Sequence, residues 1–253
     1  MNTSMPPVTD SDGYDDGASM RELRARYERL LQRLEANERE FRRLGRSVWK
    51  VQEDERRHLA RELHDGLGQT LTALKHRLAR VIEEVPRNAE IHDGLEAALA
   101  ACNDALEDTR QLSRILRPPI LDDLGLQPAL QWLARSIEQG GGMAVVLELE
   151  PLPPIDGELQ TLLFRVAQEA LTNAGKHARA TSVLLRLVAR AGELHLQVID
   201  DGKGCDPQQA LASGGSGLGG MRERLRLYGG TLQLQSAPEQ GMRLRATIPL
   251  DAA

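Results

Sequence analysis

Three residues with chemical potential, His64, Asp65 and Gln69, lie in the stretch EDERRHLARELHDGLGQTL at residues 53–71. Leucines recur there at spacings of three and four, which predicts one helix with an apolar stripe. His64 lies one residue, or about 100° of rotation, beyond Leu63 of that stripe, so its imidazole is expected to face solvent or a partner. Gln69 follows Asp65 by four residues, which predicts a common face. By itself, a histidine in this position is most often an ordinary surface residue.

Two glycines, Gly66 and Gly68, lie inside this predicted helix. Each costs about 1 kcal/mol relative to alanine, and nothing in the local pattern compensates for that cost. Gly68 comes one turn after His64, so bare backbone is expected beside the imidazole. Either another domain approaches closely there, or the helix is frayed or kinked.

A second set of polar residues belongs to a predicted helix at 156–178, where Glu169 and Asn173 are four residues apart on one face. An asparagine oxygen suits Mg²⁺, a hard cation that takes few protein ligands. Lys176 and His177 near the helix end are candidate phosphate contacts. The alternative is ordinary polar decoration, with terminal cations favoured by the helix dipole. The apolar stripe that would bury this helix is Leu159, Leu163, Val166, Ala170 and Ala174.

The motif VIDDGKG at 198–204 combines the end of a predicted strand with two carboxylates and two glycines. Asp200 is expected at the strand end, where its carboxylate can accept a hydrogen bond from an exocyclic amine. Gly202 and Gly204 allow a tight turn and a close approach to a flat base. Alone, the motif is equally typical of a polar β-turn.

A glycine-rich segment, SGGSGLGGMRER at 213–224, precedes a predicted helix. Backbone N–H groups and the helix dipole at such a place suit phosphate. The segment is neither a Walker loop nor a dinucleotide fingerprint, because no Gly-Lys-Ser/Thr follows and the surrounding pattern is not βαβ. The alternative is a flexible linker.

Composition limits the classes of protein and the compartment. Hydrophobic residues make up 41% of the chain but aromatic residues only 3%, so the cores must be aliphatic. A net charge of −5 argues against nucleic acid as a direct partner. Two distant cysteines, Cys102 and Cys205, indicate a reducing cytoplasm. We expect neither a membrane span nor a signal peptide, since no window of about 18 apolar residues exists and the N-terminus is acidic and polar.

The N-terminal part is predicted to be a disordered tail at 1–18 followed by a coiled-coil helix at 19–52. Apolar residues from Leu23 to Val51 alternate spacings of four and three, and Asn37 on this seam favours a parallel dimer. A long helix packed on its own chain is the alternative. The seam slips by one residue across Glu53–Arg57, which predicts a switch point that passes a change in the coiled coil to His64.

Residues 53–118 are predicted to form an antiparallel helical hairpin, which Pro86 and Asn88 interrupt and Pro118 ends. A hairpin of two striped helices cannot close a core alone, so we expect a homodimer with a four-helix bundle. Residues 119–253 mix helical and strand periods in separate runs, which predicts a two-layer α+β sandwich. Strands are expected at 143–150, 181–189, 193–200, 231–236 and 242–250, with a short helix around Trp132 and another helix ending at Tyr228.

In this order and spacing, the motifs strongly resemble sensor histidine kinases of the nitrate-sensor-like subfamily. His64, Asp65 and Gln69 match its His-Asp-x-x-x-Gln phosphoacceptor helix, and LRPPILDDLGL at 116–126 and MRERL at 221–225 match further strings of that subfamily. The second half resembles the N, G1 and G2 boxes of the Bergerat-type ATPase that histidine kinases share with gyrase and Hsp90-like proteins. The residues that match these boxes are Glu169, Asn173, Asp200, Gly202, Gly204, Gly215, Gly217, Leu218 and Gly219.

The resemblance implies that Asn173 binds Mg²⁺, that Asp200 reads the adenine of ATP, and that the glycine box forms a lid. It further implies autophosphorylation of His64 and transfer of the phosphoryl group to an aspartate of a response regulator receiver domain. Asp65 would accept the second imidazole N–H, and Gln69 would orient water in a phosphatase reaction. The input would be missing or would come from a separate sensory protein.

Some residues depart from the pattern or stay open. Cys205 stands where the subfamily has a bulky apolar residue. Arg56, Arg57 and Arg61 either contact phosphate or the regulator, or form a solvated face. Two rival functions are a Bergerat ATPase that phosphorylates serine on a partner protein and a catalytically silent dimeric adaptor. The histidines that lack the surrounding string, and are therefore not proposed as acceptors, are His58, His76, His92 and His195.

Overall fold

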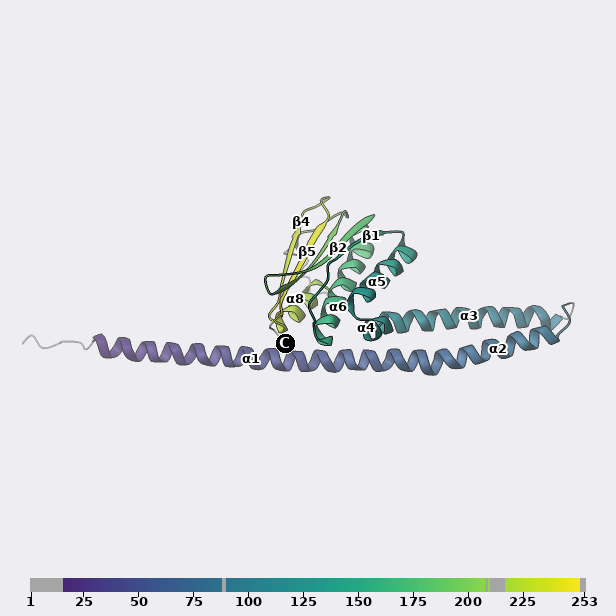
Figure 1. Ribbon diagram of the computed structural model, residues 1–253, viewed down its shortest axis with the longest axis horizontal. Helices are drawn as coiled ribbons and strands as arrows, with labels where there is room; N and C mark the ends of the chain where they lie inside the picture. The colour runs from purple at the N-terminus through teal and green to yellow at the C-terminus, as the bar shows by residue number, and fades with distance from the viewer. Residues whose placement is uncertain (1–15, 88–89, 208, 210–216, 251–253) are drawn as a thin grey trace, which may run out of the picture. The chain divides into compact units, whose positions relative to one another are not determined.

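The structure is a computed structural model that describes residues 16–87, 90–207, 209 and 217–250 (Figure 1). Tail residues 1–15 and Gly215 of the predicted glycine box lie outside the described residues. Contacts divide the chain into two compact units, Met1–Leu44 and Gly45–Ala253. The division falls before the predicted boundary at residues 52 and 53, because side chains from Gly45 onward pack against the C-terminal half of the chain.

Helix α1 (Asp16–Glu62) is continuous over 47 residues, so the helix begins three residues earlier than predicted. Ion pairs one turn apart, Arg42 with Glu38 and Arg43 with Glu40, support its solvated side. The predicted seam is exposed in the single chain, as Leu34 and Phe41 illustrate at 64% and 60%. That exposure suits packing on a second copy, and the coiled-coil dimer stays a prediction.

The predicted single helix around His64 is wrong in one respect, because a π-helix, η1 (Leu63–Gly68), separates α1 from α2 (Gln69–Glu84). A π turn is wider than an α turn and leaves backbone carbonyls without their usual partners. Thr70 Oγ1 donates to the Gly66 carbonyl at 2.9 Å, and Thr72 Oγ1 donates to the Gly68 carbonyl at 2.7 Å. The kinked-helix interpretation of the two glycines is therefore the one that the structure supports.

Helix α3 (Glu90–Leu116) returns along η1 and α2 to complete the predicted hairpin. Ser113 Oγ donates to the Ala60 carbonyl at 2.9 Å and ties the two arms together. On α3, Cys102, Leu106 and Thr109 are buried within the chain at 6%, 4% and 5% exposed, whereas Leu112 is 54% exposed. The apolar side chains left exposed on the hairpin are Leu59, Leu67, Leu74, Val81, Ile91, Leu112 and Ile115.

The C-terminal half is the predicted two-layer sandwich. Its helices are α4 (Pro119–Asp123), α5 (Leu126–Gly141), α6 (Gly157–Asn173) with the π-helix η2 (Ala174–Ala178), and α8 (Leu218–Leu227). Its strands are β1 (Ala144–Leu149), β2 (Ser182–Arg190), β3 (Glu193–Asp200), β4 (Thr231–Ser236) and β5 (Met242–Pro249). The sheet order is β1-β2-β3-β5-β4, and β1 and β2 form the parallel pair.

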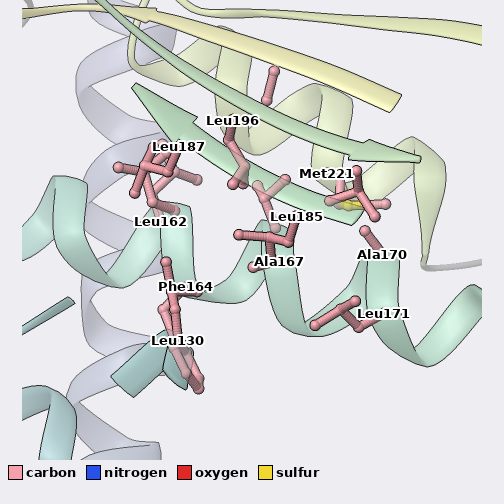
Figure 2. Packing of buried hydrophobic residues seen from close by; sticks show 14 of the residues in the cluster. Leu130, Leu162, Phe164, Ala167, Ala170, Leu171, Leu185, Leu187, Leu196 and Met221 are labelled. Atoms are coloured by element: carbon pink, nitrogen blue, oxygen red, sulfur yellow. The ribbon is translucent and has the colours of Figure 1, made fainter. Parts of the chain in front are cut away.

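One face of the sheet carries the core, as Figure 2 shows for Leu185, Leu187 and Leu196 above the helices. Alternate strand residues point inward because the side-chain period of a strand is two, so Val183, Leu185 and Leu187 of β2 are all fully buried. The predicted stripe of α6, from Leu159 to Ala174, faces them and is buried throughout. Among the described residues, no helix is both long and apolar enough to cross a lipid bilayer.

Candidate functional site: a nucleotide pocket and an exposed histidine

A cavity of about 540 Å³ opens beside the C-terminal half of α6, within the size range of small-molecule sites. Helix α6, η2, the end of β3, the start of β5 and the start of α8 all contribute to it. Its lining residues are Glu169, Ala170, Asn173, Ala174, His177, Ala178, Val198, Asp200, Lys203, Gly204, Cys205, Gly217, Leu218, Met242 and Leu244. The structure thus brings together residues from three predicted motifs that are far apart in sequence.

Asp200 supplies the carboxylate of this cavity at the end of β3. Its Oδ1 accepts a hydrogen bond from the Gly202 N–H at 2.9 Å. Burial raises the pKa of Asp200 above its usual value, although the N–H groups of Gly202 and Met242 oppose the shift. Val198, Met242 and Leu244 supply apolar walls beside it. A half-buried acceptor among apolar walls suits a flat heterocycle with an exocyclic amine.

Glu169 and Asn173 face the same cavity from α6, as their spacing predicts. Asn173 Nδ2 donates to Glu169 Oε1 at 3.3 Å, which leaves Asn173 Oδ1 as an available oxygen ligand. A Cβ at Gly217 would lie 2.5 Å from Glu169 Oε1, so a glycine is needed where the segment before α8 passes this pair. Among the described residues, no group of three or more His, Cys, Asp and Glu could hold a metal ion. Any cation here would depend on Asn173 and on the bound ligand.

The glycines of the VIDDGKG motif form a tightly packed turn beside the cavity. A Cβ at Gly202 would lie 2.5 Å from Ala178 Cβ, and a Cβ at Gly204 would lie 2.0 Å from the Ala237 carbonyl oxygen. Gly204 has a φ of +62°, in the left-handed region that favours glycine. Both glycines are therefore needed for close packing of the loop on its own protein; Gly204 also lines the cavity, and its place beside a base stays a prediction.

Three predicted residues, Gly202, Lys176 and Gly219, do not line the cavity. Lys176 and its neighbour His177 are both exposed, but only His177 lines the cavity. Gly219 lies in the first turn of α8, and a Cβ built there meets nothing within 4 Å. Sequence reasoning in turn missed Lys203 and Met242. The register that pairs Met242 with Asp200 brings Met242 to the cavity, and no short motif could reveal it.

His64 is exposed, as predicted, and borders two further cavities on the hairpin. One, of about 720 Å³, is lined by Arg57, Ala60, Arg61, His64, Asp65, Arg117, Pro119, Asp122 and Asp123. The other, of about 460 Å³, is lined by His64, Gly68, Gln69, Thr72, Ala73, His76, Leu106, Thr109 and Arg110.

Asp65 and Gln69 therefore border different cavities instead of the predicted common face. The reason is the π turn, whose extra residue per turn shifts positions four apart off one line. No hydrogen bond joins Asp65 to His64 in the part of the chain that the structure describes. His64 does not line the nucleotide cavity, and no residue of that cavity lines either of the two cavities at His64.

Fold and site together define an ATPase-type sandwich joined to a helical hairpin that displays a histidine. Comparison with known families agrees. Residues 55–121 match the family described as histidine kinase, and residues 158–252 match the family of histidine kinase-, DNA gyrase B- and HSP90-like ATPases. The chain belongs to the sensor histidine kinases, in the nitrate-sensor-like subfamily, and its second half is an ATP-binding domain.

Curated relatives support this assignment. The sensor histidine kinase MctS of Rhizobium johnstonii is 36% identical over 217 residues, which cover 83% of this chain and 46% of that protein. The histidine-protein kinase/phosphatase DegS of Brevibacillus brevis is 32% identical, covering 84% of this chain and 55% of that protein. The chain thus spans about half the length of these relatives.

Solved structures that are similar include the histidine kinase domain of the Erythrobacter litoralis EL346 blue-light activated histidine kinase. It is 22% identical, with a TM-score of 0.49, over 72% of this chain and 94% of that one. The mycobacterial sensor histidine kinase MprB is 22% identical, with a TM-score of 0.40, over 47% of this chain and 91% of that one.

Proposed function

We propose that the chain is the catalytic core of a two-component sensor kinase, which phosphorylates its own His64 with ATP and passes the phosphoryl group to a response regulator aspartate. The observation that carries this proposal is the presence, in one chain, of an exposed histidine on a hairpin and a cavity lined by Glu169, Asn173 and Asp200. Neither an adaptor nor an ordinary ATPase needs both.

In the proposed reaction, the Asp200 carboxylate accepts a hydrogen bond from the adenine amine, and the triphosphate extends past Glu169 and Asn173. Asn173 Oδ1 would hold Mg²⁺, which neutralises phosphate charge when it is bound. A ring nitrogen of His64 forms a bond to the γ-phosphorus while the bond from that phosphorus to the β–γ bridging oxygen breaks, and ADP leaves. Phosphoryl transfer of this kind depends chiefly on positioning and charge.

Asp65 and Gln69 have proposed roles in the acceptor helix. Asp65 accepts a hydrogen bond from the N–H of the second ring nitrogen and stabilises the imidazolium as it forms, after a rotamer change that brings it to the ring. Gln69 borders the other cavity at His64, where it would orient water for hydrolysis of the regulator's phosphoaspartate. The kinase/phosphatase name of the Brevibacillus relative supports this second activity.

The assembly is also part of the proposal. Residues 53–118 would form the dimerisation and phosphotransfer domain and residues 119–253 the ATP-binding domain, with residues 19–52 as a coiled coil. Exposed Leu67, Leu74 and Leu112 support pairing of two hairpins in a homodimer. A receiver domain would bind the bundle, and a separate sensory protein would supply the input. A cytoplasmic location would fit a response regulator as the partner.

The chemistry of the label distinguishes this proposal from its rivals. Incubation with γ-labelled ATP and Mg²⁺ is expected to give acid-labile, alkali-stable label on the chain itself, the behaviour of a phosphoamide. Omission of Mg²⁺ is expected to abolish labelling. Acid-stable label on serine of a partner would indicate the serine kinase, and absence of ATP binding would indicate the adaptor.

Asp200→Asn is expected to weaken ATP binding by about 10- to 100-fold, since a hydrogen bond to a charged group contributes about 1.5–3 kcal/mol. The ionised carboxylate is the form that accepts from the amine. Because burial raises its pKa, wild-type affinity should fall as pH is lowered through a value above the ordinary 3.8. Calorimetric titration at several pH values measures both effects. Asp93→Asn on α3 is the control, and equal affinities for wild type and Asp200→Asn would refute the assigned role.

A further inference from the structure

Three arginines lie on α1 in the turns that precede the phosphoacceptor histidine, and each has a different environment. Arg57 and Arg61 line the larger of the two cavities at His64, whereas Arg56 does not. Arg56 Nη1 instead lies 3.5 Å from the carboxylate of Glu53. From the sequence alone, these side chains either contact phosphate or a regulator, or face solvent. Their surroundings in the folded chain separate them.

Arg57 is held by the carboxylate of Asp122 on α4. Its Nη2 donates to Asp122 Oδ1 at 3.0 Å, and its Nε donates to Asp122 Oδ2 at 3.2 Å. Arg117, which lines the same cavity and is 4% exposed, donates to Asp122 Oδ1 at 2.8 Å. Although burial raises the pKa of Asp122, the hydrogen bonds from Arg117 and Arg57 bring it below its usual value. Both guanidinium groups are therefore committed to one ionised carboxylate.

Arg61 differs from these two because it forms no ion pair within the described part of the chain. Its Nε donates to the Arg57 carbonyl at 3.4 Å, a long and weak bond within α1. Asp65 and Asp123 border the same cavity, yet neither is paired with Arg61 among the residues that the structure describes. The exposed Arg61 guanidinium thus keeps its two Nη groups available for a two-pronged contact with an oxyanion.

The other cavity at His64 carries one arginine, and that arginine has a partner. Arg110 of α3 lines the cavity of about 460 Å³, and its Nη1 lies 3.6 Å from Glu107 Oε2. The two cavities at His64 are lined by four arginines in all, Arg57, Arg61, Arg110 and Arg117. Within the described residues, Arg61 is the member of this set that has no carboxylate partner.

The histidine ring and Arg61 are also neighbours on the helix surface. Residues three positions apart on a helix have Cβ atoms about 5–6 Å apart. A helical side chain leans toward the N-terminus and covers the turn before its own Cα, which for His64 is the turn that carries Arg61. The cavity of about 720 Å³ opens there, since Ala60, Arg61 and His64 all line it. A phosphoryl group on the ring therefore has room beside the Arg61 guanidinium.

We propose that Arg61 is a further catalytic residue, whose guanidinium binds the phosphoryl group during its transfer to His64 and in the phosphorylated protein. This role rests on the proposed function, because it concerns the same transfer. A ring nitrogen forms the bond to the γ-phosphorus, the bond to the β–γ bridging oxygen breaks, and Arg61 neither gains nor loses a proton. Its contribution is a fixed positive charge with aligned N–H donors, placed where negative charge gathers.

Arg61→Gln in the full chain tests this role. At saturating ATP and Mg²⁺, the initial rate of autophosphorylation should fall about 100-fold, the usual effect of losing one aligned donor in an active site. The Kd for ATP should stay unchanged, because Arg61 does not line the nucleotide cavity. Arg61→Lys should recover part of the rate, since an ammonium keeps the charge but not the planar fork. Arg80→Gln, an exposed position on α2 outside these cavities, is the control and should change neither quantity.

A second measurement does not depend on ATP. Phosphoramidate serves as the phosphoryl donor: a ring nitrogen of His64 bonds to its phosphorus, the P–N bond of the donor breaks, and ammonia leaves. The ³¹P NMR signal that is absent from His64→Gln then reports on the phosphoryl group at His64. Its pKa should be lower in wild type than in Arg61→Gln, because a neighbouring positive charge favours the dianion. An equal pKa in the two proteins would overturn the contact.

The two measurements separate failure of this role from failure of the proposed function. If ATP gives no label in wild type, the kinase proposal fails, and the contact of Arg61 with the phosphoryl group is still read from the phosphoramidate-treated protein. If wild type is labelled and Arg61→Gln is labelled at the same rate, the kinase proposal stands. The catalytic role of Arg61 is then overturned, and contact with the regulator is left as the use of this side chain.

Discussion

His64→Gln is expected to reduce incorporation of label from γ-labelled ATP to background while leaving ATP affinity unchanged. Glutamine has no nitrogen that can form a phosphoamide under these conditions, so the acceptor itself is lost. The side chain is exposed and outside the nucleotide cavity, and therefore neither folding nor ATP binding should suffer. Labelling followed by gel separation measures the first quantity, and calorimetry measures the second.

Two histidines on the same helices serve as controls. His58 is exposed on α1, 3.3 Å from Glu62, and His76 borders the same cavity as Gln69. His58→Gln and His76→Gln should retain the label, because neither ring is the acceptor. Label that persists in His64→Gln, or disappears in His58→Gln alone, would show that the acceptor has been misassigned.

Gly204→Ala should give the largest loss of stability among single substitutions in the glycine motifs. Alanine in the left-handed region costs about 1–2 kcal/mol, and forcing extra atoms into a packed site costs about 1–3 kcal/mol more. Both costs apply, because φ is +62° and the new Cβ would lie 2.0 Å from the Ala237 carbonyl oxygen. The free energy of unfolding should fall by about 2–5 kcal/mol in urea denaturation followed by circular dichroism.

Gly219→Ala is the matched control from the other glycine motif. Its Cβ meets nothing within 4 Å, and the residue lies in helix α8, where alanine is favoured over glycine by up to about 1 kcal/mol. Stability should stay the same or rise slightly. Comparable destabilisation by the two substitutions would mean that loop geometry at Gly204 is not the cause.

Local patterns in the sequence identify much of the fold and site. The period-two alternation at 193–200 and 231–236 predicts β3 and β4 with the bounds that the structure has. The stripe from Leu159 to Ala174 predicts the buried face of α6, and the spacing of Glu169 and Asn173 predicts that they point the same way. Such features repeat within a few residues, so hydrophobic periodicity and side-chain spacing are sufficient to reveal them.

Irregular backbone escapes that kind of reasoning. The π turn at Leu63–Gly68 places Asp65 and Gln69 in different cavities, although a regular helix would align them. Helix propensity indicates only that glycine is costly in a helix. In the structure, the hydroxyls of Thr70 and Thr72 donate to the backbone carbonyls that the wider π turn leaves without partners. Local composition cannot distinguish fraying from a stable π turn.

The motifs, and the helices and strands that carry them, can be predicted from the sequence alone, since these depend on neighbours along the chain. Contacts between distant residues depend on the folded arrangement, as for Met242 with Asp200 through strand register and Glu53 with Arg165 across 112 positions. From the sequence, Glu53 is expected to be solvated because it lies in a charged helix. In the folded protein it is buried between Arg165 and Arg117. Burial is a property of the assembled elements, and for that reason the docking of the ATP-binding domain on α1 could not be predicted from the sequence.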